Sequence, residues 1–143
     1  MEFALWFHDA IYDPRASDNE ARSTRLAEQV LTAAGLSPAI VARVAACIRV
    51  TEHRGEPAAP DEALVLDVDL SILGQDEATF DAYERQVREE YNWVPEAQFA
   101  SARTAVLRRF LERRHIYNTD HFRRRYEARA RENLAHSIAA LSG

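Results

Sequence analysis

The sequence predicts an all-α protein, and three kinds of pattern support that prediction. Apolar side chains recur at three- and four-residue spacing, which is the period of an amphipathic helix. Glycines and prolines fall at the boundaries of these segments and not inside them. Residues that favour helix N-caps precede most of the segments. Because no internal repeat or linker is evident, residues 1–143 are expected to form a single helical-bundle domain.

The first half of the chain is expected to contain three helices. Proline ends the first, a capping box opens the second, and serine followed by proline opens the third. A glycine after the second supplies the left-handed residue with which helices often end. The residues concerned are Asp13-Pro14, Ser17 with Glu20, Ser37-Pro38 and Gly35, and the third helix ends at His53. The stretch 54–60, with its glycine and prolines, is expected to be a loop.

Four further helices are expected in the second half. Aspartate caps two of them, proline interrupts one, and Asn118 or Thr119 caps the last. The expected segments are 62–73 after Asp61, closed by Gly74; a helix after Asp76, interrupted by Pro95; 98–111; and a final helix that includes Leu141.

One segment, 63–71, also alternates as a β-strand would. A strand would place Asp67 and Asp69 on one face. A helix would turn them about 200° apart, so that at most one points into a given site. Both interpretations remain open at this point.

Cysteine usage and hydropathy indicate a cytoplasmic protein. The single Cys47 lies among apolar residues and permits no internal disulfide, which favours a reducing compartment. The N-terminus lacks the basic region of a signal peptide, and no apolar stretch approaches the ~20 residues that cross a bilayer. We therefore expect no membrane partner.

Arginines make the C-terminal third basic, although the formal net charge of the chain is −5. Nearby glutamates such as Glu127 and Glu132 indicate solvated, internally paired helix faces. Aromatic residues are not interleaved as base stacking requires, so nucleic-acid binding is not expected. Three histidines in this region, His115, His121 and His136, are expected to be surface residues.

The adjacent pair His8-Asp9 is the strongest functional signal in the chain. An apolar block, residues 3–7, precedes it and implies that the pair is buried at the end of a helix. Buried ionisable groups are rarely left without a partner. A histidine beside a carboxylate is a suitable pair of ligands for a divalent metal, and a helix cap or a surface pair is the structural alternative.

Asp67, Asp69 and His53 are the other candidates. The two aspartates lie in the most apolar segment, where a carboxylate needs a cation, an arginine or several donors. They are therefore either metal ligands or members of structural Asp–Arg pairs. His53 ends a helix, where it either interacts with the helix dipole or serves a site by binding phosphate or transferring a proton.

These residues together resemble the HD superfamily of metal-dependent phosphohydrolases, and more closely an uncharacterised bacterial family of predicted HD-domain phosphohydrolases. The similarity runs through nearly the whole chain. It rests on residues 5–14, 18–20, 51–53, 66–74, 90–91, 94–95, 114–117 and 133–134. The resemblance implies an all-α fold and hydrolysis of a phosphate ester, such as that of a nucleotide.

The superfamily pattern implies a ligand set for one divalent ion. His8 and Asp9 match the HD pair, Asp69 best matches the distant aspartate, and Asp67 is a close rival. His53 matches a further histidine that some members place near the phosphate. The ion is expected to be Mn, Fe, Co, Ni, Zn or Mg.

The implied reaction uses water activated by the metal. Asp9 is expected both to ligate the ion and to orient the water, and His53 to bind phosphate or protonate the leaving oxygen. Arg22 and Arg25, on the next helix, are candidate phosphate contacts by position alone. The partner is a small phosphorylated substrate.

The chain departs from the pattern because the family's isolated first histidine would lie upstream of Met1. We therefore expect an N-terminally shortened member with apolar surface exposed around Phe3, Trp6 and Phe7, and a homodimer through that face would cover it.

Two other functions remain open. One is a non-catalytic or degenerate helical domain that acts through protein partners. The other is a haloacid-dehalogenase-type phosphatase, which requires the segment ending at Asp67 and Asp69 to be a strand.

Overall fold

The computed structural model describes residues 1–53 and 55–143 and divides the chain into two compact units, Met1–Asp69 and Leu70–Gly143. The described residues form α- and 3₁₀-helices and contain no strand, so the all-α prediction is confirmed. None of the helices among these residues has the length and apolar character needed to cross a membrane. The single-domain expectation stays a prediction.

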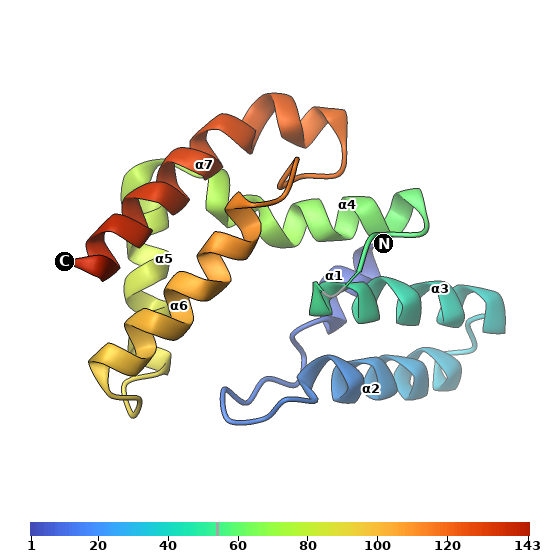
Figure 1. Cartoon of the computed structure of the whole chain (residues 1–143). Helices are drawn as coiled ribbons and strands as arrows, with labels where there is room; N and C mark the ends of the chain where they lie inside the picture. Colours follow the sequence, from blue (N-terminus) through green and yellow to red (C-terminus); the bar gives the residue numbers. More distant parts are fainter. Residues whose placement is uncertain (54) are drawn as a thin grey trace. The chain divides into compact units, whose positions relative to one another are not determined.

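The first unit consists of α1 (Glu2–Phe7), α2 (Asn19–Ala33), α3 (Pro38–Arg49), the 3₁₀ turn η1 (Val50–Glu52) and α4 (Pro60–Asp69). Helices α2 and α3 lie side by side, and α1 packs against both (Figure 1). Apolar side chains from all four α-helices make its core, which includes Ala4, Leu31, Ile48 and Val65. Cys47 is buried in this core as a free thiol, and burial raises the pKa of that thiol.

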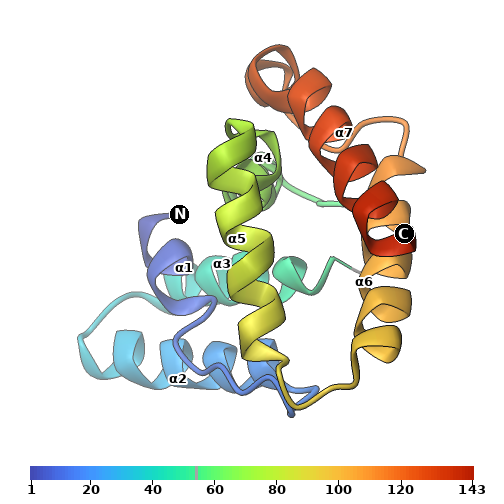
Figure 2. The same ribbon diagram turned by 90° about the vertical axis from the view of Figure 1, so that its left-hand side faces the viewer.

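The second unit consists of the 3₁₀ turn η2 (Leu70–Gly74), α5 (Glu77–Glu90), α6 (Glu96–Leu111) and α7 (Asp120–Ser142). Helix α7 lies along α6 and also packs on η2 (Figure 2). The core of this unit includes Phe80, Leu107, Tyr117 and Leu134. Asn133 fixes the register of α7, because its side-chain amide donates to the carbonyl oxygens of Leu73 at 2.8 Å and Gln75 at 3.0 Å.

Several predicted helix boundaries are confirmed. The Ser37 hydroxyl accepts from the backbone N–H of Ile40 with Pro38 at the first helical position, and Asp76 caps α5 by accepting from Thr79. Gly35 has a φ of 81°, the left-handed conformation expected after a helix. Thr119 is the N-cap residue of α7, although its side chain makes no capping hydrogen bond.

Other boundaries differ from the expectation. Helix α1 ends at Phe7, well before Pro14, because the backbone of Ile11 exchanges hydrogen bonds with the hydroxyl of Ser23 and not with its own helix. Asp18, and not Ser17, is the N-cap residue of α2. The expected helix 62–73 begins earlier, at Pro60, and tightens into η2 after Asp69, and α6 begins at Glu96 instead of Gln98.

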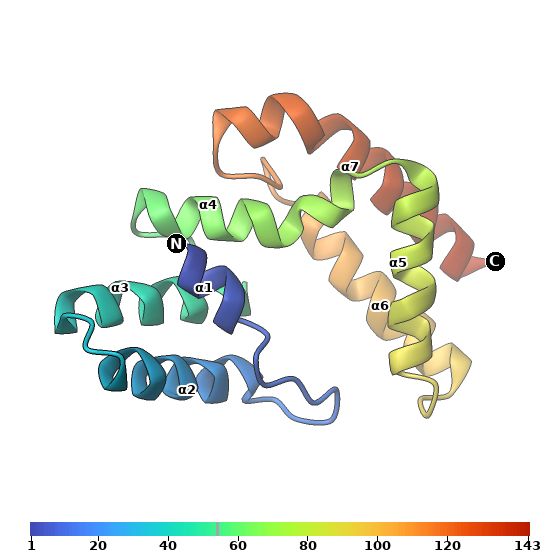
Figure 3. The same cartoon turned by 180° about the vertical axis from the view of Figure 1, so that it is seen from behind.

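The strand interpretation of 63–71 is wrong, because these residues belong to α4 and η2 (Figure 3). The haloacid-dehalogenase alternative depended on a strand at this position and loses its basis. The predicted loop 54–60 falls between η1 and α4, with Arg54 itself outside the described residues and Pro60 already helical.

Candidate metal centre

His8 follows the last residue of α1, and its ring is oriented by its own helix. The Nδ1 atom donates a hydrogen bond to the backbone carbonyl of Leu5 at 2.9 Å. Since a carbonyl only accepts, this contact places a proton on Nδ1 and directs Nε2 away from the helix. Metal-binding histidines are commonly fixed in the same way by a backbone carbonyl. The ring is 18% exposed, so it is largely but not fully removed from water.

Asp69, the last residue of α4, is the carboxylate on which the site converges. One of its oxygens lies 3.4 Å from Nε2 of His8, and the other lies 2.9 Å from Nε2 of His53. Asp9 adds a second carboxylate, 3.1 Å from the same nitrogen of His8. Residues from α1, the end of η1 and α4 therefore meet at one place within the first unit.

The electrostatics of this cluster favour a positive charge between the carboxylates. Hydrogen bonds to Asp69 and then to Asp9 raise the pKa of His8 from 6.5 to about 10, against an opposing effect of burial. Burial alone would raise the pKa of Asp69, but hydrogen bonds from His53 and His8 outweigh it and lower that pKa to about 2. In the metal-free chain a proton on His8 thus supplies the charge that a bound cation would supply.

His53 reaches this cluster through an unusual backbone conformation. Its φ of 54° and ψ of 25° place it in the left-handed region at the end of η1. A non-glycine residue there is strained by about 1–3 kcal/mol, and such strain is concentrated at functional sites. The left-handed turn ends the helix and allows the imidazole to meet Asp69. The dipole alternative does not account for this contact.

The two aspartates of α4 are separated as a helix requires. His8 and His53 both contact the carboxylate of Asp69. Asp67 is completely buried, with 0% of its surface exposed, and lies about 200° away around the helix. The geometry therefore favours Asp69 over Asp67 as the distant ligand.

The donor set suits a divalent transition metal, since it combines imidazole nitrogen with carboxylate oxygen. The ligand atoms of His8, Asp9 and Asp69 do not all lie within 4.8 Å of one another. Within residues 1–53 and 55–143, another group of side chains, described below, does meet that condition. Asp9 is 69% exposed, so its carboxylate has room to turn from its contact with His8 toward Asp69. The residues present therefore fit the ion after one side-chain rotation.

The apolar block before His8 is only partly buried, which corrects the expectation from the sequence. Ala4 is fully buried and Leu5 and Phe7 pack against the core. Phe3 and Trp6 project outward, and Trp6 is 83% exposed. Because such a short helix has one face toward the core and one toward solvent, not all of its apolar residues can point inward. The exposed surface predicted around Phe3 and Trp6 is present, but Phe7 does not belong to it.

Arg22 and Arg25 on α2 stay predictions as phosphate contacts. Among the described residues neither side chain makes a hydrogen bond or ion pair to the cluster. The basic C-terminal third is partly paired internally, as expected: Arg131 forms an ion pair with Glu127 at 2.8 Å and donates to the carbonyl oxygens of Leu111 and Arg113.

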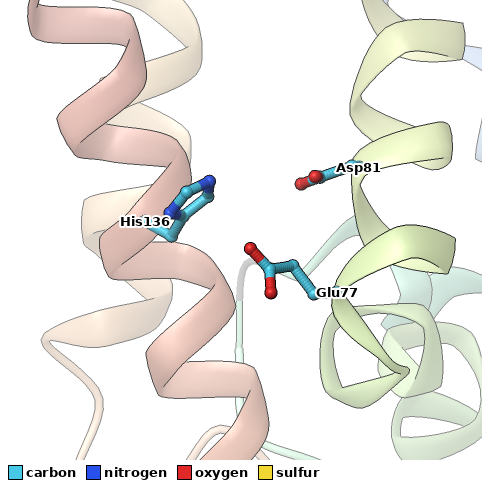
Figure 4. A group of neighbouring side chains, drawn as sticks. All are labelled: Glu77, Asp81 and His136. Atoms are coloured by element: carbon cyan, nitrogen blue, oxygen red, sulfur yellow. The ribbon is translucent and has the colours of Figure 1, made fainter.

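Sequence reasoning missed a second cluster of ligand-type side chains, in the second unit. Glu77 and Asp81 on α5 face His136 on α7, and Figure 4 shows the imidazole directed toward the two carboxylates. The four-residue spacing of Glu77 and Asp81 was a usable signal. Nothing local to His136 indicated that it would meet them, because the packing of α7 decides that.

Comparison with known proteins adds no relative. No protein-family model, no curated protein and no solved structure matches this chain. The functional argument therefore rests on the residues and their geometry.

Proposed function

We propose that the protein is a metal-dependent phosphohydrolase whose centre is formed by His8, Asp9 and Asp69, with His53 beside it. The observation that carries this proposal is the meeting of Asp69 with two histidines, at 3.4 Å from Nε2 of His8 and 2.9 Å from Nε2 of His53. Residues that are far apart in the sequence thus converge around a shared carboxylate. The resemblance to HD-domain phosphohydrolases supports the same assignment.

Each residue has a distinct role in the proposed reaction. A divalent ion held there lowers the pKa of a bound water and neutralises charge on a phosphate oxygen. His8 presents Nε2 as a ligand because Nδ1 is already bonded to Leu5. Asp69 would help to hold the ion, and its oxygen that lies 2.9 Å from Nε2 of His53 holds that ring in place. His53 is thereby positioned to bind phosphate or to protonate the leaving oxygen.

Asp9 is the most exposed member of the set, and this suits a residue that has two tasks. Its carboxylate balances the charge at His8 and is accessible to water. We therefore assign it both ligation and orientation of the attacking water. The substrate class is a small phosphate ester, such as a nucleotide.

The test is metal analysis of the untagged chain, purified without chelator, followed by assays on phosphate esters. We expect Mn, Fe, Co, Ni or Zn in near-stoichiometric amount, lost in His8→Ala and in Asp69→Ala. The ester panel should include p-nitrophenyl phosphate, its diester, and nucleoside mono-, di- and triphosphates. Activity should fall in step with metal content.

Two matched variants keep this test specific. His121→Ala removes an exposed histidine of α7, and Asp61→Ala removes a partly exposed aspartate of α4; both should retain metal and activity. All measurements should be repeated in a His136→Ala background, so that metal held by the second cluster is not counted. Full metal content and activity in Asp69→Ala would refute the ligand assignment.

The exposed side chains of α1 favour a second candidate, a helical domain that acts through protein contacts. Met1, Phe3 and Trp6 are 45%, 46% and 83% exposed, which is unusual for a cluster of large apolar residues. A second copy of the chain is one partner that would cover them. Sedimentation analysis of the wild type and Trp6→Glu tests this: a dimer that Trp6→Glu dissociates, in a chain that binds no metal, favours this candidate over the enzyme.

A further inference from the structure

The cluster of Glu77, Asp81 and His136 lies wholly within the second unit and has no part in the function proposed above. Each residue offers one ligand atom, and these atoms all lie within 4.8 Å of one another. Asp81 is half-buried, and the other two are exposed. In Figure 4 the carboxylates extend from α5 and the imidazole from the facing side of α7, so that all three point into the same space.

The ligand spacing is close to what one ion requires. Zinc bonds to nitrogen and oxygen are about 2.0–2.2 Å long, which places ligands of the same ion about 3–4 Å apart. A maximum separation of 4.8 Å therefore needs only small side-chain rotations. Glu77 and His136 have the freedom to make them because they are exposed.

The simplest alternative is that the two acids are ordinary surface residues in the first turns of α5. Acids near a helix N-terminus are stabilised by the helix dipole, but acids four residues apart on one face repel each other. The imidazole of His136 adds a nitrogen ligand from a different helix, which a solvated acidic face does not explain. Among residues 1–53 and 55–143, none of these three side chains has a hydrogen bond or ion pair that competes for its ligand atom.

Flanking contacts fix the position of His136 relative to α5. One turn earlier on α7, Asn133 is bonded to the carbonyl oxygens of Leu73 and Gln75, just before α5 begins. The next residue, Ser137, donates to a carboxylate oxygen of Glu84 at 3.1 Å, one turn beyond Asp81. That carboxylate is also paired with Arg103 of α6, in a largely buried ion pair. These side-chain contacts, to η2 before His136 and to α5 after it, fix the register of α7 on both sides of His136.

The cluster also borders a cavity. A depression of about 790 Å³ is lined by α5, α6 and α7, and Asp81 and His136 are among its lining residues. Water therefore has access to the proposed ion, and three protein ligands leave coordination positions for it. Sites with three protein ligands and an open position are the usual form of accessible zinc centres.

We propose that Glu77, Asp81 and His136 form a second site for a divalent transition-metal ion of the zinc class. The ion links α5 to α7 through one imidazole and two carboxylates, and water completes its coordination. The mixed nitrogen and oxygen ligands favour Zn²⁺, Co²⁺ or Ni²⁺ over Mg²⁺ or Ca²⁺, which prefer oxygen alone.

The experiment is equilibrium dialysis of the full chain against Zn²⁺, comparing the wild type with His136→Ala. We expect His136→Ala to bind one zinc ion fewer per chain. Glu77→Gln and Asp81→Asn should each weaken that binding event by more than about tenfold, because even residues that only orient ligands contribute about 10–100-fold. His121→Ala, another exposed histidine of α7, should bind as much zinc as the wild type.

A second measurement identifies the ligand directly. In ¹⁵N-detected imidazole spectra of an Asp69→Ala chain, in which the first centre is disabled, resonances that are absent when His136→Ala is added should shift as Zn²⁺ is titrated in. Circular dichroism checks that the variants fold; they should, because the side chain of His136 is exposed. Equal zinc stoichiometry and affinity in the wild type and His136→Ala, or unshifted His136 resonances, would overturn the proposal. A chain that lacks the first metal centre would still lose its zinc in His136→Ala, so the two proposals fail separately.

Discussion

The two clusters of ligand-type residues, one in each unit, differ in how strongly the chain has organised them in advance. His8, Asp9, Asp69 and His53 are already joined by contacts of 2.9–3.4 Å, and the rings of both histidines are less than a fifth exposed. Glu77, Asp81 and His136 face one another without such contacts, and two of them are exposed. An organised, half-buried site suits catalysis, which depends on fixed geometry. An exposed and adjustable site suits simple binding of an ion.

The largest expected effect is that of Asp69→Ala in the first unit. This change removes the carboxylate that both histidines contact, so we expect metal affinity at that centre to fall by more than about 100-fold, beyond the usual effect of residues that only orient ligands. It also leaves His8 without its main partner, and the melting temperature should fall. Metal content, hydrolysis of the best phosphate ester and thermal unfolding are the measurements.

Asp61→Ala, on the same helix, is the matched control and should change none of these strongly. If Asp69→Ala lost no more metal than Asp61→Ala, the contrast between an organised and an adjustable site would have no functional meaning.

Substitution of His53 separates chemistry from backbone strain. Asparagine tolerates the left-handed conformation, so His53→Asn should fold normally but lose about 10²-fold or more in kcat, the usual contribution of a group that transfers a proton. His53→Gly relieves the φ of 54° and should gain backbone stability while losing the same activity. Steady-state kinetics and thermal melts distinguish the two effects. An unchanged kcat in both variants would limit His53 to a structural role beside Asp69.

Close packing of η2 on α7 in the second unit is tested by Gly74→Ala. A Cβ atom at Gly74 would lie 2.5 Å from Cβ of Tyr126 and 2.9 Å from its carbonyl oxygen, too close for either to stay in place. We expect a loss of about 1–3 kcal/mol in the free energy of unfolding, as for other overpacked positions. Gly55→Ala is the control, because an added Cβ there meets nothing within 4 Å. Denaturant unfolding provides the measurement, and equal stability of the two variants would contradict the close approach of η2 and α7.

The helices could be predicted well from the sequence. Of the two clusters, the residues of the first were predicted and the second was missed, and the reason in each case is physical. Local signals such as Ser37-Pro38, Gly35 and Asp76 act within a few residues, and each was found where expected. His8-Asp9 was recognisable because its two members are adjacent. The choice of Asp69 over Asp67 required the helical rotation of α4 to be known.

What the sequence could not provide depends on packing between helices. His136 approaches Glu77 only because Asn133 and Ser137 hold α7 in register, and no local pattern encodes that contact. The end of α1 at Phe7 likewise depends on Ser23, which lies on the next helix. Tertiary hydrogen bonds of this kind override local propensity.

The smallest expected effect compares one helix cap from each unit. Hydrogen bonds from the hydroxyl and the backbone N–H of Thr79 lower the pKa of Asp76 below its usual 3.8, so the folded state favours the charged carboxylate. A carboxyl group whose pKa is lowered by folding stabilises the protein above its unfolded pKa, and this contribution is lost as the pH falls through the folded value. The difference in melting temperature between the wild type and Asp76→Ala should therefore shrink as the pH falls from about 5 to about 2. Asp76→Asn keeps an acceptor that does not titrate, so its stability should lack this component of the pH dependence. Ser37 caps α3 in the first unit with a hydroxyl, and Ser37→Ala should lower the melting temperature by the same amount across that range. A pH-independent effect of Asp76→Ala would mean that the charge of Asp76 contributes nothing to the cap of α5.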